Sequence, residues 1–270
     1  MLQLLKTEYK KFRKNSVISL LFIVFTALMP FIILAGKSQL MQEIPPPFPS
    51  NNILFEFPTV WEWQGYIGNW LVFFILGFMV LHMFTSEVGY RTMRQNIITG
   101  YTKKEYFGAK LLTITALSLY ATLIFLISSL AYGMFHTPGF DFELVFDNNW
   151  AIFRFFLMCM GYLIFAFMIA NIFRSGGLSM FFYFSTPLIF EPIIKLTGMI
   201  QLENDMMNYL PLNTIEDLMC MPLYRTSSDF VQTNVGINMV NSFPITIGMS
   251  IVYIGLFLWI SWWKFKRSDV

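Results

Sequence analysis

Charged residues, cysteine and histidine are all scarce in this sequence. Only 13% of the 270 residues are charged, whereas 56% are hydrophobic. A chain so poor in charge lacks the polar surface that a water-soluble domain of this length needs. Of the two cysteines, Cys159 falls in an apolar run and Cys220 in a loop, so they are predicted to stay unpaired. A disulfide framework is therefore not expected.

The sequence also lacks the patterns that accompany catalysis. It has two histidines and contains none of the motifs H-E-x-x-H, C-x-x-C, G-x-S-x-G or G-x-x-x-x-G-K-[ST]. Neither metal ligands at binding spacing nor a nucleophile with its base can be found. We therefore predict no catalytic residue, no cofactor, no metal and no nucleic-acid partner for this chain. Any energy for transport has to come from a gradient or from another subunit.

Long apolar runs are what the sequence has in abundance. A hydrocarbon core of roughly 30 Å needs about 20 apolar residues per helical crossing, and helices satisfy their own backbone groups in lipid. Six runs meet this requirement, at residues 17–35, 67–85, 111–135, 155–172, 178–194 and 244–263. Pro187 and Pro192 predict a broken or re-entrant region after the fifth run. The predicted fold is a single all-α integral membrane domain, residues 1–270, with six transmembrane helices.

The basic residues indicate which way the chain faces. With six crossings, fourteen of the eighteen Lys and Arg residues fall on one side of the membrane. Short cytoplasmic loops carry such an excess of positive charge. We therefore predict a multi-pass protein of the bacterial cytoplasmic membrane, with both termini and the link 86–110 in the cytoplasm. The segment 201–243 is predicted to be external.

The first fifteen residues form an amphipathic pattern. Leu2, Leu5 and Tyr9 recur at helical spacing, with Lys6 and Lys10 on the other side. This pattern is typical of a helix that lies in the headgroup layer. The alternative is a plain positive flank that only sets the topology.

The link between the second and third runs has the clearest local signals. Gly100 is well placed to end a helix in the left-handed conformation, and Thr102 followed by Glu105 predicts a capping box that opens the next helix. The link is thus predicted to contain a short helix at 90–99, then a turn, and then a helix that runs into the third span. The short helix mixes apolar and basic residues, which suits either docking on a protein or packing on the membrane surface.

Charges inside the membrane are the remaining functional candidates. Glu191 and Lys195 are four residues apart, within reach of a helical ion pair, and Arg154 lies near the outer end of the fourth run. These residues either steady a broken helix or handle an ion. The pattern alone leaves both interpretations open.

The chain resembles the permease subunits of type-2 ATP-binding-cassette (ABC) transporters. The resemblance covers most of the sequence, from the basic amphipathic start through six spans with an outer loop before the last. Its most specific part is the link, with Glu87 at the end of the second span, the step Arg91-Thr92 and the capped start Thr102-Lys103-Lys104-Glu105. The sequence of the link is most similar to that of the corresponding segment in permeases of Bacteroidota and related bacteria.

This resemblance implies an ATP-driven exporter whose link is seated on an ATPase. The coupling residues that it implies, here called the link set, are Glu87, Tyr90, Arg91, Met93, Arg94, Ile97 and Ile98. It also implies separate ABC ATPase subunits that bind ATP and Mg, and a second permease copy or a paralogue that completes the pathway. Membrane lipid is the other expected partner.

Two other classes of function remain open. In an ion-coupled secondary transporter or channel, Glu191, Lys195 and Arg154 would handle the ion. An intramembrane enzyme would need a catalytic set that the sequence does not contain. An ATPase gene beside this one would favour the ABC permease.

The charge distribution makes a prediction about topology. A reporter fused after Val270 should be cytoplasmic, whereas reporters inserted near Asn148 or Ser227 should be external, because the basic segments stay inside. Reporter activity in intact cells measures this directly. If a cysteine placed at Thr99 is labelled by a reagent added outside intact cells, the predicted orientation is wrong.

Overall fold

The computed structural model describes residues 15–40, 55–90, 92–98, 100–202, 205–222 and 240–267, and throughout these ranges the chain forms helices and turns without a strand. Five helices in the described part are long and apolar enough to cross a membrane, and a shorter apolar stretch covers Ser16–Phe31. The predicted interfacial helix at 1–15 lies, except for its last residue, outside the described residues. The all-helical class predicted from the sequence is confirmed.

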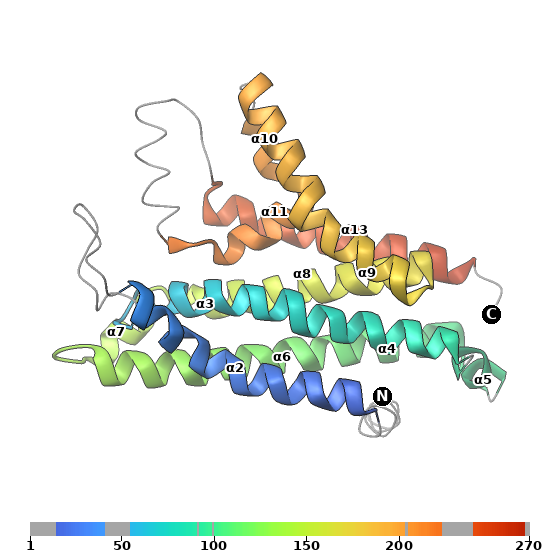
Figure 1. Ribbon diagram of the computed structural model, residues 1–270, viewed down its shortest axis with the longest axis horizontal. Coiled ribbons are helices and arrows are strands. Elements are labelled where there is room, and N and C mark those ends of the chain that lie inside the picture. Colours follow the sequence, from blue (N-terminus) through green and yellow to red (C-terminus); the bar gives the residue numbers. More distant parts are fainter. Residues whose placement is uncertain are drawn as a thin grey trace.

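The helices run side by side, and several of them join end to end (Figure 1). The N-terminal half contains α2 (Ser16–Leu40), α3 (Val60–Leu71), the π segment η2 (Val72–Gly77), α4 (Phe78–Gly89), α5 (Thr92–Ile98), α6 (Lys103–His136) and α7 (Phe142–Phe146). The C-terminal half contains α8 (Trp150–Phe173), α9 (Gly176–Ser185), the π segment η3 (Thr186–Phe190), α10 (Glu191–Leu202), η4 (Asp205–Tyr209), α11 (Pro211–Glu216), η5 (Asp217–Met219) and α13 (Phe243–Lys266).

Helix α8 is the central element and is buried around most of its circumference. It packs against α3, α4, α6, α9, α11 and α13. Its sequence is apolar on every side, and such a helix is stable only in the interior of a bundle. Small residues allow neighbours to come close, so that a methyl group added at Gly161 would lie 2.9 Å from the side chain of Ile215. The core of the molecule is therefore organised around α8.

The second predicted span begins earlier than residue 67, at Val60. Glu62 and Gln64 make this stretch look too polar for a span. In the fold, however, Gln64 is fully buried and its Nε2 donates hydrogen bonds to the Met29 carbonyl (2.7 Å) and to Ser128 Oγ (3.1 Å). A buried amide that is hydrogen-bonded to neighbouring helices is tolerated in an apolar bundle. Local hydropathy therefore underestimates the length of this helix.

The prolines of the fifth span do not end its helix, which extends beyond the predicted apolar run at 178–194. The helix continues from Gly176 to Leu202 through α9, η3 and α10. Pro187 lies within η3, where the wider π geometry accommodates a residue that has no N–H to donate. Helix α10 then leaves the bundle at an angle (Figure 1).

The chain turns back onto the bundle after α10. The helices η4, α11 and η5 lie in the segment that was predicted to be external, and α11 packs between α8 and α13. Leu212, Ile215 and Leu218 are buried there. This part of the segment therefore belongs to the core, although the sequence predicts only surface helices and loops.

The two cysteines behave as predicted. Both are free, with Cys159 buried in α8 and Cys220 half-buried after η5. The structure therefore contains no disulfide between them.

Packing of η2 against α9 provides a test of the fold. The Tyr183 hydroxyl donates to the Phe73 carbonyl at 3.0 Å, and a methyl group at Gly77 would overlap this hydroxyl. We expect Gly77→Ala to lower stability by about 1–3 kcal/mol, because overpacking displaces Tyr183. Thermal unfolding of the purified protein in detergent measures the change.

A matched control for this substitution lies in α13. A Cβ at Gly248 would meet open space, and alanine is the better helix former. Gly248→Ala should therefore leave the unfolding temperature unchanged or slightly higher. An equal fall in both variants would contradict the role given to the contact with Tyr183.

Candidate functional site

The link between α4 and α6 folds as the sequence predicts. The short helix α5 is followed by Gly100 with a φ of +112°, a left-handed conformation that glycine adopts without strain. Thr102 Oγ1 accepts a hydrogen bond from the Glu105 amide (3.2 Å), and Glu105 Oε2 accepts one from the Thr102 amide (2.9 Å). The predicted capping box is confirmed, and α6 continues from it through the third span.

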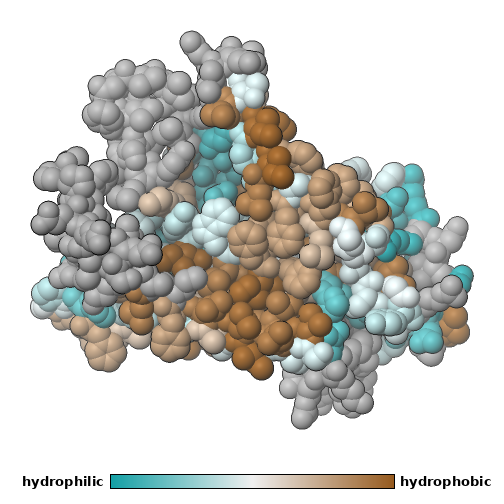
Figure 2. All heavy atoms as spheres, in the orientation of Figure 1, coloured by the Kyte–Doolittle hydropathy of each residue, from teal (hydrophilic) through white to brown (hydrophobic). Residues whose placement is uncertain are grey.

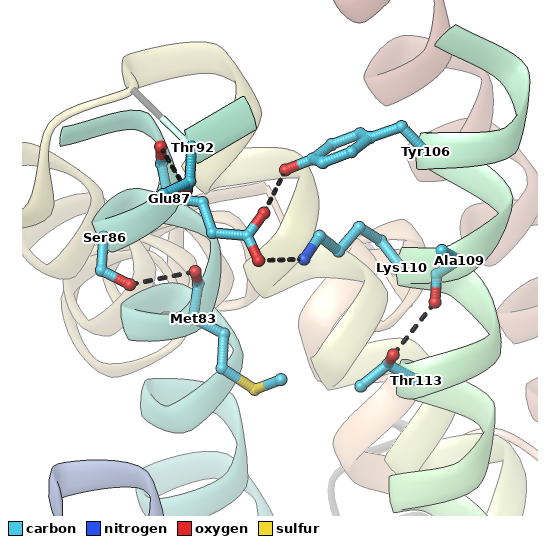
Figure 3. Close-up of polar contacts among 8 residues, drawn as sticks. All are labelled: Met83, Ser86, Glu87, Thr92, Tyr106, Ala109, Lys110 and Thr113. Atoms are coloured by element: carbon cyan, nitrogen blue, oxygen red, sulfur yellow. Dashed lines mark hydrogen bonds and ion pairs between the residues drawn. The ribbon is translucent and has the colours of Figure 1, made fainter. Parts of the chain in front are cut away.

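A buried ion pair lies directly beneath the link (Figure 3). Lys110 Nζ of α6 is 2.5 Å from Glu87 Oε1 at the end of α4. Tyr106, one helical turn before Lys110, donates its hydroxyl to Glu87 Oε2 at 2.6 Å. The two charged side chains are only 5% and 8% exposed. Both carboxylate oxygens of Glu87 are therefore occupied by α6.

The network of Glu87, Tyr106 and Lys110 also contacts α5 and α13. Thr92 Oγ1 of α5 donates to the backbone carbonyl of Glu87 at 3.2 Å. The Tyr106 ring stacks on Phe265 of α13, with centroids 5.6 Å apart and planes inclined by 9°. A displacement of α5 would thus reach α4, α6 and α13 through residues that are in direct contact.

The link set divides into an inward and an outward group. Met93 is 5% exposed and packs in the core of the chain itself. Tyr90 and Ile98 are 79% and 77% exposed, and Arg94 is also exposed. Ile97 is half-buried, and Arg91 lies outside the described residues. The outward group, Tyr90, Arg94 and Ile98, presents one basic and two large apolar side chains to the surroundings.

The family to which the chain belongs follows from a comparison with known families. The family described as "ABC-2 family transporter protein" matches residues 4–190, which include the link and the first four predicted spans. The chain belongs to this family of ABC transporter permeases. No curated protein matches it. In this family of multi-pass membrane proteins, the permease chain typically has no ATPase activity of its own.

Glu191 of the permease holds the start of another helix. Its Oε1 accepts the Leu212 amide at 3.0 Å and its Oε2 accepts the Asn213 amide at 2.7 Å, both in the first turn of α11. A carboxylate at this position accepts hydrogen bonds from amides that have no partner inside the helix. Its negative charge is also attracted to the positive end of the helix dipole. Lys195 donates to Asn213 Oδ1 at 2.8 Å. Glu191 and Lys195 therefore meet at α11.

Arg154 has a different set of partners from Glu191 and Lys195. Its guanidinium donates to Asn148 Oδ1 at 2.9 Å and is 3.7 Å from Glu62 of α3. It also lies 3.6 Å from the centroid of the Phe243 ring at the start of α13. The side chain is nearly fully buried and links α3, α8 and α13 at the end of the bundle opposite α5. Its guanidinium also donates to the Leu218 carbonyl of η5 at 3.3 Å, so Arg154 holds the turn that directly follows α11.

The sequence alone does not single out several residues of these sites. Tyr106 and Lys110 share one face of α6 because they are four residues apart, yet nothing local pairs them with Glu87. Asn213 and Glu216 belong to a short helix that no apolar run indicates. A signal was present for α11 in Pro211, which is a preferred first residue of a helix.

The ion pair beneath the link makes a testable prediction. We expect Glu87→Gln and Lys110→Met each to lower stability by about 3–5 kcal/mol, because each leaves the other charge buried without its partner. The double variant should lose less than the two single losses combined. Unfolding of all four proteins in detergent forms a double-mutant cycle. Additive losses would show that the two charges do not stabilise each other.

Proposed function

We propose that this permease is the membrane-spanning subunit of an ATP-driven ABC exporter, coupled at its cytoplasmic face to separate ATPase subunits. The observation that carries the proposal is the orientation of α5. Met93 anchors this helix in the bundle, while Arg94 and Ile98 remain exposed at one end of the molecule. Exposed anchors on a fixed short helix suit a groove on a partner protein.

The placement of the described chain ends supports the proposed topology. The start of α2 and the end of α13 lie at the same end of the bundle as α5 (Figure 1). Lys103 Nζ at the start of α6 donates to the Lys266 carbonyl near the end of α13 at 3.2 Å. If α2 crosses the membrane as a sixth span, both termini lie in the cytoplasm with the basic link.

The surface of the bundle agrees with a membrane environment. Apolar atoms cover the middle of the molecule, and hydrophilic atoms gather at the end that carries α5 (Figure 2). Large exposed side chains such as Leu119, Leu123 and Trp259 lie on α6 and α13, where lipid tails would cover them. We include α2 among the spans for the same reason, because Leu20 and Ile23 are exposed on it.

The position of α8 favours a pathway that is shared between two permeases. Because α8 fills the centre of the bundle, little space is left there for a molecule to pass. The pathway would then run between this chain and a second copy or a paralogue, and closed two-fold assemblies are the commonest arrangement of subunits. The ion-coupled alternative has less support, because Glu191, Lys195 and Arg154 each have a structural partner.

The outward group of the link set can be tested in the complex with the ATPase. We expect Ile98→Asp and Arg94→Gln each to reduce co-purification of the ATPase, or substrate-stimulated ATP hydrolysis, about tenfold or more, because interface anchors contribute most of the binding energy. Pull-down and ATPase assays on the reconstituted complex provide the measurement.

The control is Lys264→Gln, which also removes one exposed positive charge on the same side of the membrane. It should leave assembly and hydrolysis unchanged. Met93→Asp is a poor test, because it places a charge in the permease's own core. Full assembly and coupling in the Arg94 and Ile98 variants would exclude α5 as the docking element.

A further inference from the structure

A cavity of about 440 Å³ opens between α10, α11 and the start of the second span. Its polar lining consists of Tyr66, Glu191, Lys195, Asn213, Glu216 and Asp217. Hydrophilic atoms lie beside α10 in the space-filling view, next to the apolar side chains of that helix (Figure 2). The cavity is thus a polar hollow at the edge of an apolar surface.

The lining of the cavity is acidic. Three carboxylates face one lysine. Glu191 is held by the amides of α11, and Asn213 connects Lys195 to Asp217 through Oδ1 (2.8 Å) and Nδ2 (3.0 Å). The Glu216 carboxylate makes no hydrogen bond or ion pair with the other residues that the structure describes. The Glu216 carboxylate is therefore available to accept hydrogen bonds from a ligand in the cavity.

A second acceptor borders a smaller space that Glu216 also lines. A small space of about 10 Å³, also bordered by Glu216 and Pro187, is lined by Asn69, Trp70, Phe73 and Tyr162. Asn69 is 2% exposed, and its Oδ1 has no hydrogen-bond partner within the described ranges. Leaving a buried carbonyl oxygen unsatisfied costs about 1–3 kcal/mol. An acceptor of this kind favours a ligand that donates a hydrogen bond.

We propose that the cavity binds an organic cation that carries N–H donors and an apolar body. Its charged group would lie against the Glu216 carboxylate in the larger cavity, with one N–H donor directed toward the small space beside Asn69 Oδ1. Its apolar body would contact Pro187, Leu196 and the ring of Trp70, which border the two spaces. Exposed Ile193 and Leu196 on α10 give such an amphiphile a route from lipid.

An organic cation fits this lining better than a metal ion does. The described part of the chain contains no group of three or more His, Cys, Asp or Glu residues that could hold a metal. The Tyr66 ring in the lining of the larger cavity offers a π face that attracts an organic cation. The ligand class therefore follows from both the acceptors and this ring.

Binding should depend on pH through Glu216, which lies outside the candidate spans. Burial and the neighbouring Asp217 raise the pKa of Glu216 to about 7, and Lys195 opposes the rise. Glu191 also faces the cavity from α10, and Tyr66, Tyr162 and Cys220 complete the surroundings. The carboxylate is ionised above pH 7 and attracts the cation, whereas below pH 7 it is protonated and does not. Affinity should fall about tenfold from pH 8 to pH 6.

This inference deepens the proposed function, because the bound cation would be a transported substrate. The binding is nevertheless tested on the full-length permease in lipid nanodiscs without the ATPase. Failure of the site therefore stays distinct from failure of coupling. The probe is rhodamine 6G, an aromatic cation with N–H donors, and sulforhodamine B serves as the dye of the same frame with a net negative charge. Fluorescence anisotropy measures both.

We expect rhodamine 6G to bind and sulforhodamine B not to bind. Glu216→Gln should weaken rhodamine 6G binding at pH 8 about tenfold or more and remove most of its pH dependence, because a charge-assisted hydrogen bond is lost. Asn69→Leu should weaken binding without removing the pH dependence. Glu143→Gln, which removes an exposed carboxylate on α7, should change neither.

The pH titration of the unaltered permease tests the proposal even if a variant fails to fold. Binding that is equal at pH 6 and pH 8 would overturn the assignment to Glu216. Equal affinity of the two dyes, or an equal loss in Glu143→Gln and Glu216→Gln, would overturn the cation site itself.

Discussion

The burial of α8 is the constraint on which the rest of the structure depends. A helix that is apolar on every side has no surface to offer to water, and in this fold α8 is surrounded by α3, α4, α6, α9, α11 and α13. Its few polar side chains then become points of attachment. Asn171 donates to the Ser261 hydroxyl at 2.9 Å and ties α8 to α13. Arg154 does the same for α3 and α13 at the other end of α8.

The interior of the bundle also requires that backbone groups be satisfied without water. Two features of the fold meet this requirement with side chains from distant helices. Tyr183 of α9 donates to the Phe73 carbonyl in η2, and Glu191 of α10 accepts two amides of α11. Both interactions occur at or next to π segments, where the regular helical pattern changes. The irregular places in the helices are therefore also the places where neighbouring helices are held.

Charge is used differently at the two ends of the molecule. Near α5, Glu87 and Lys110 neutralise each other, and Tyr106 occupies the remaining carboxylate oxygen. Near α11, carboxylates outnumber the single lysine, and Glu216 stays available in a cavity. A closed pair suits a rigid joint beneath a docking helix. A cavity with more carboxylates than lysines suits reversible binding of a cation. The two sites thus agree with the coupling and the recognition that we propose for this ABC-2 permease.

The sequence by itself determined the features that depend on neighbouring residues. Five of the six apolar runs, the left-handed turn at Gly100 and the capping box of Thr102 with Glu105 are local features that appear in the structure as predicted, and the first run appears as a shorter apolar helix. Only the tertiary structure decided that Met93 points into the core, that Gln64 lies inside a span and that Glu191 holds α11. Each of these depends on partners far away in the chain. Hydropathy and helical spacing report how one segment meets its solvent, whereas the direction of a buried side chain depends on which other segments pack against it.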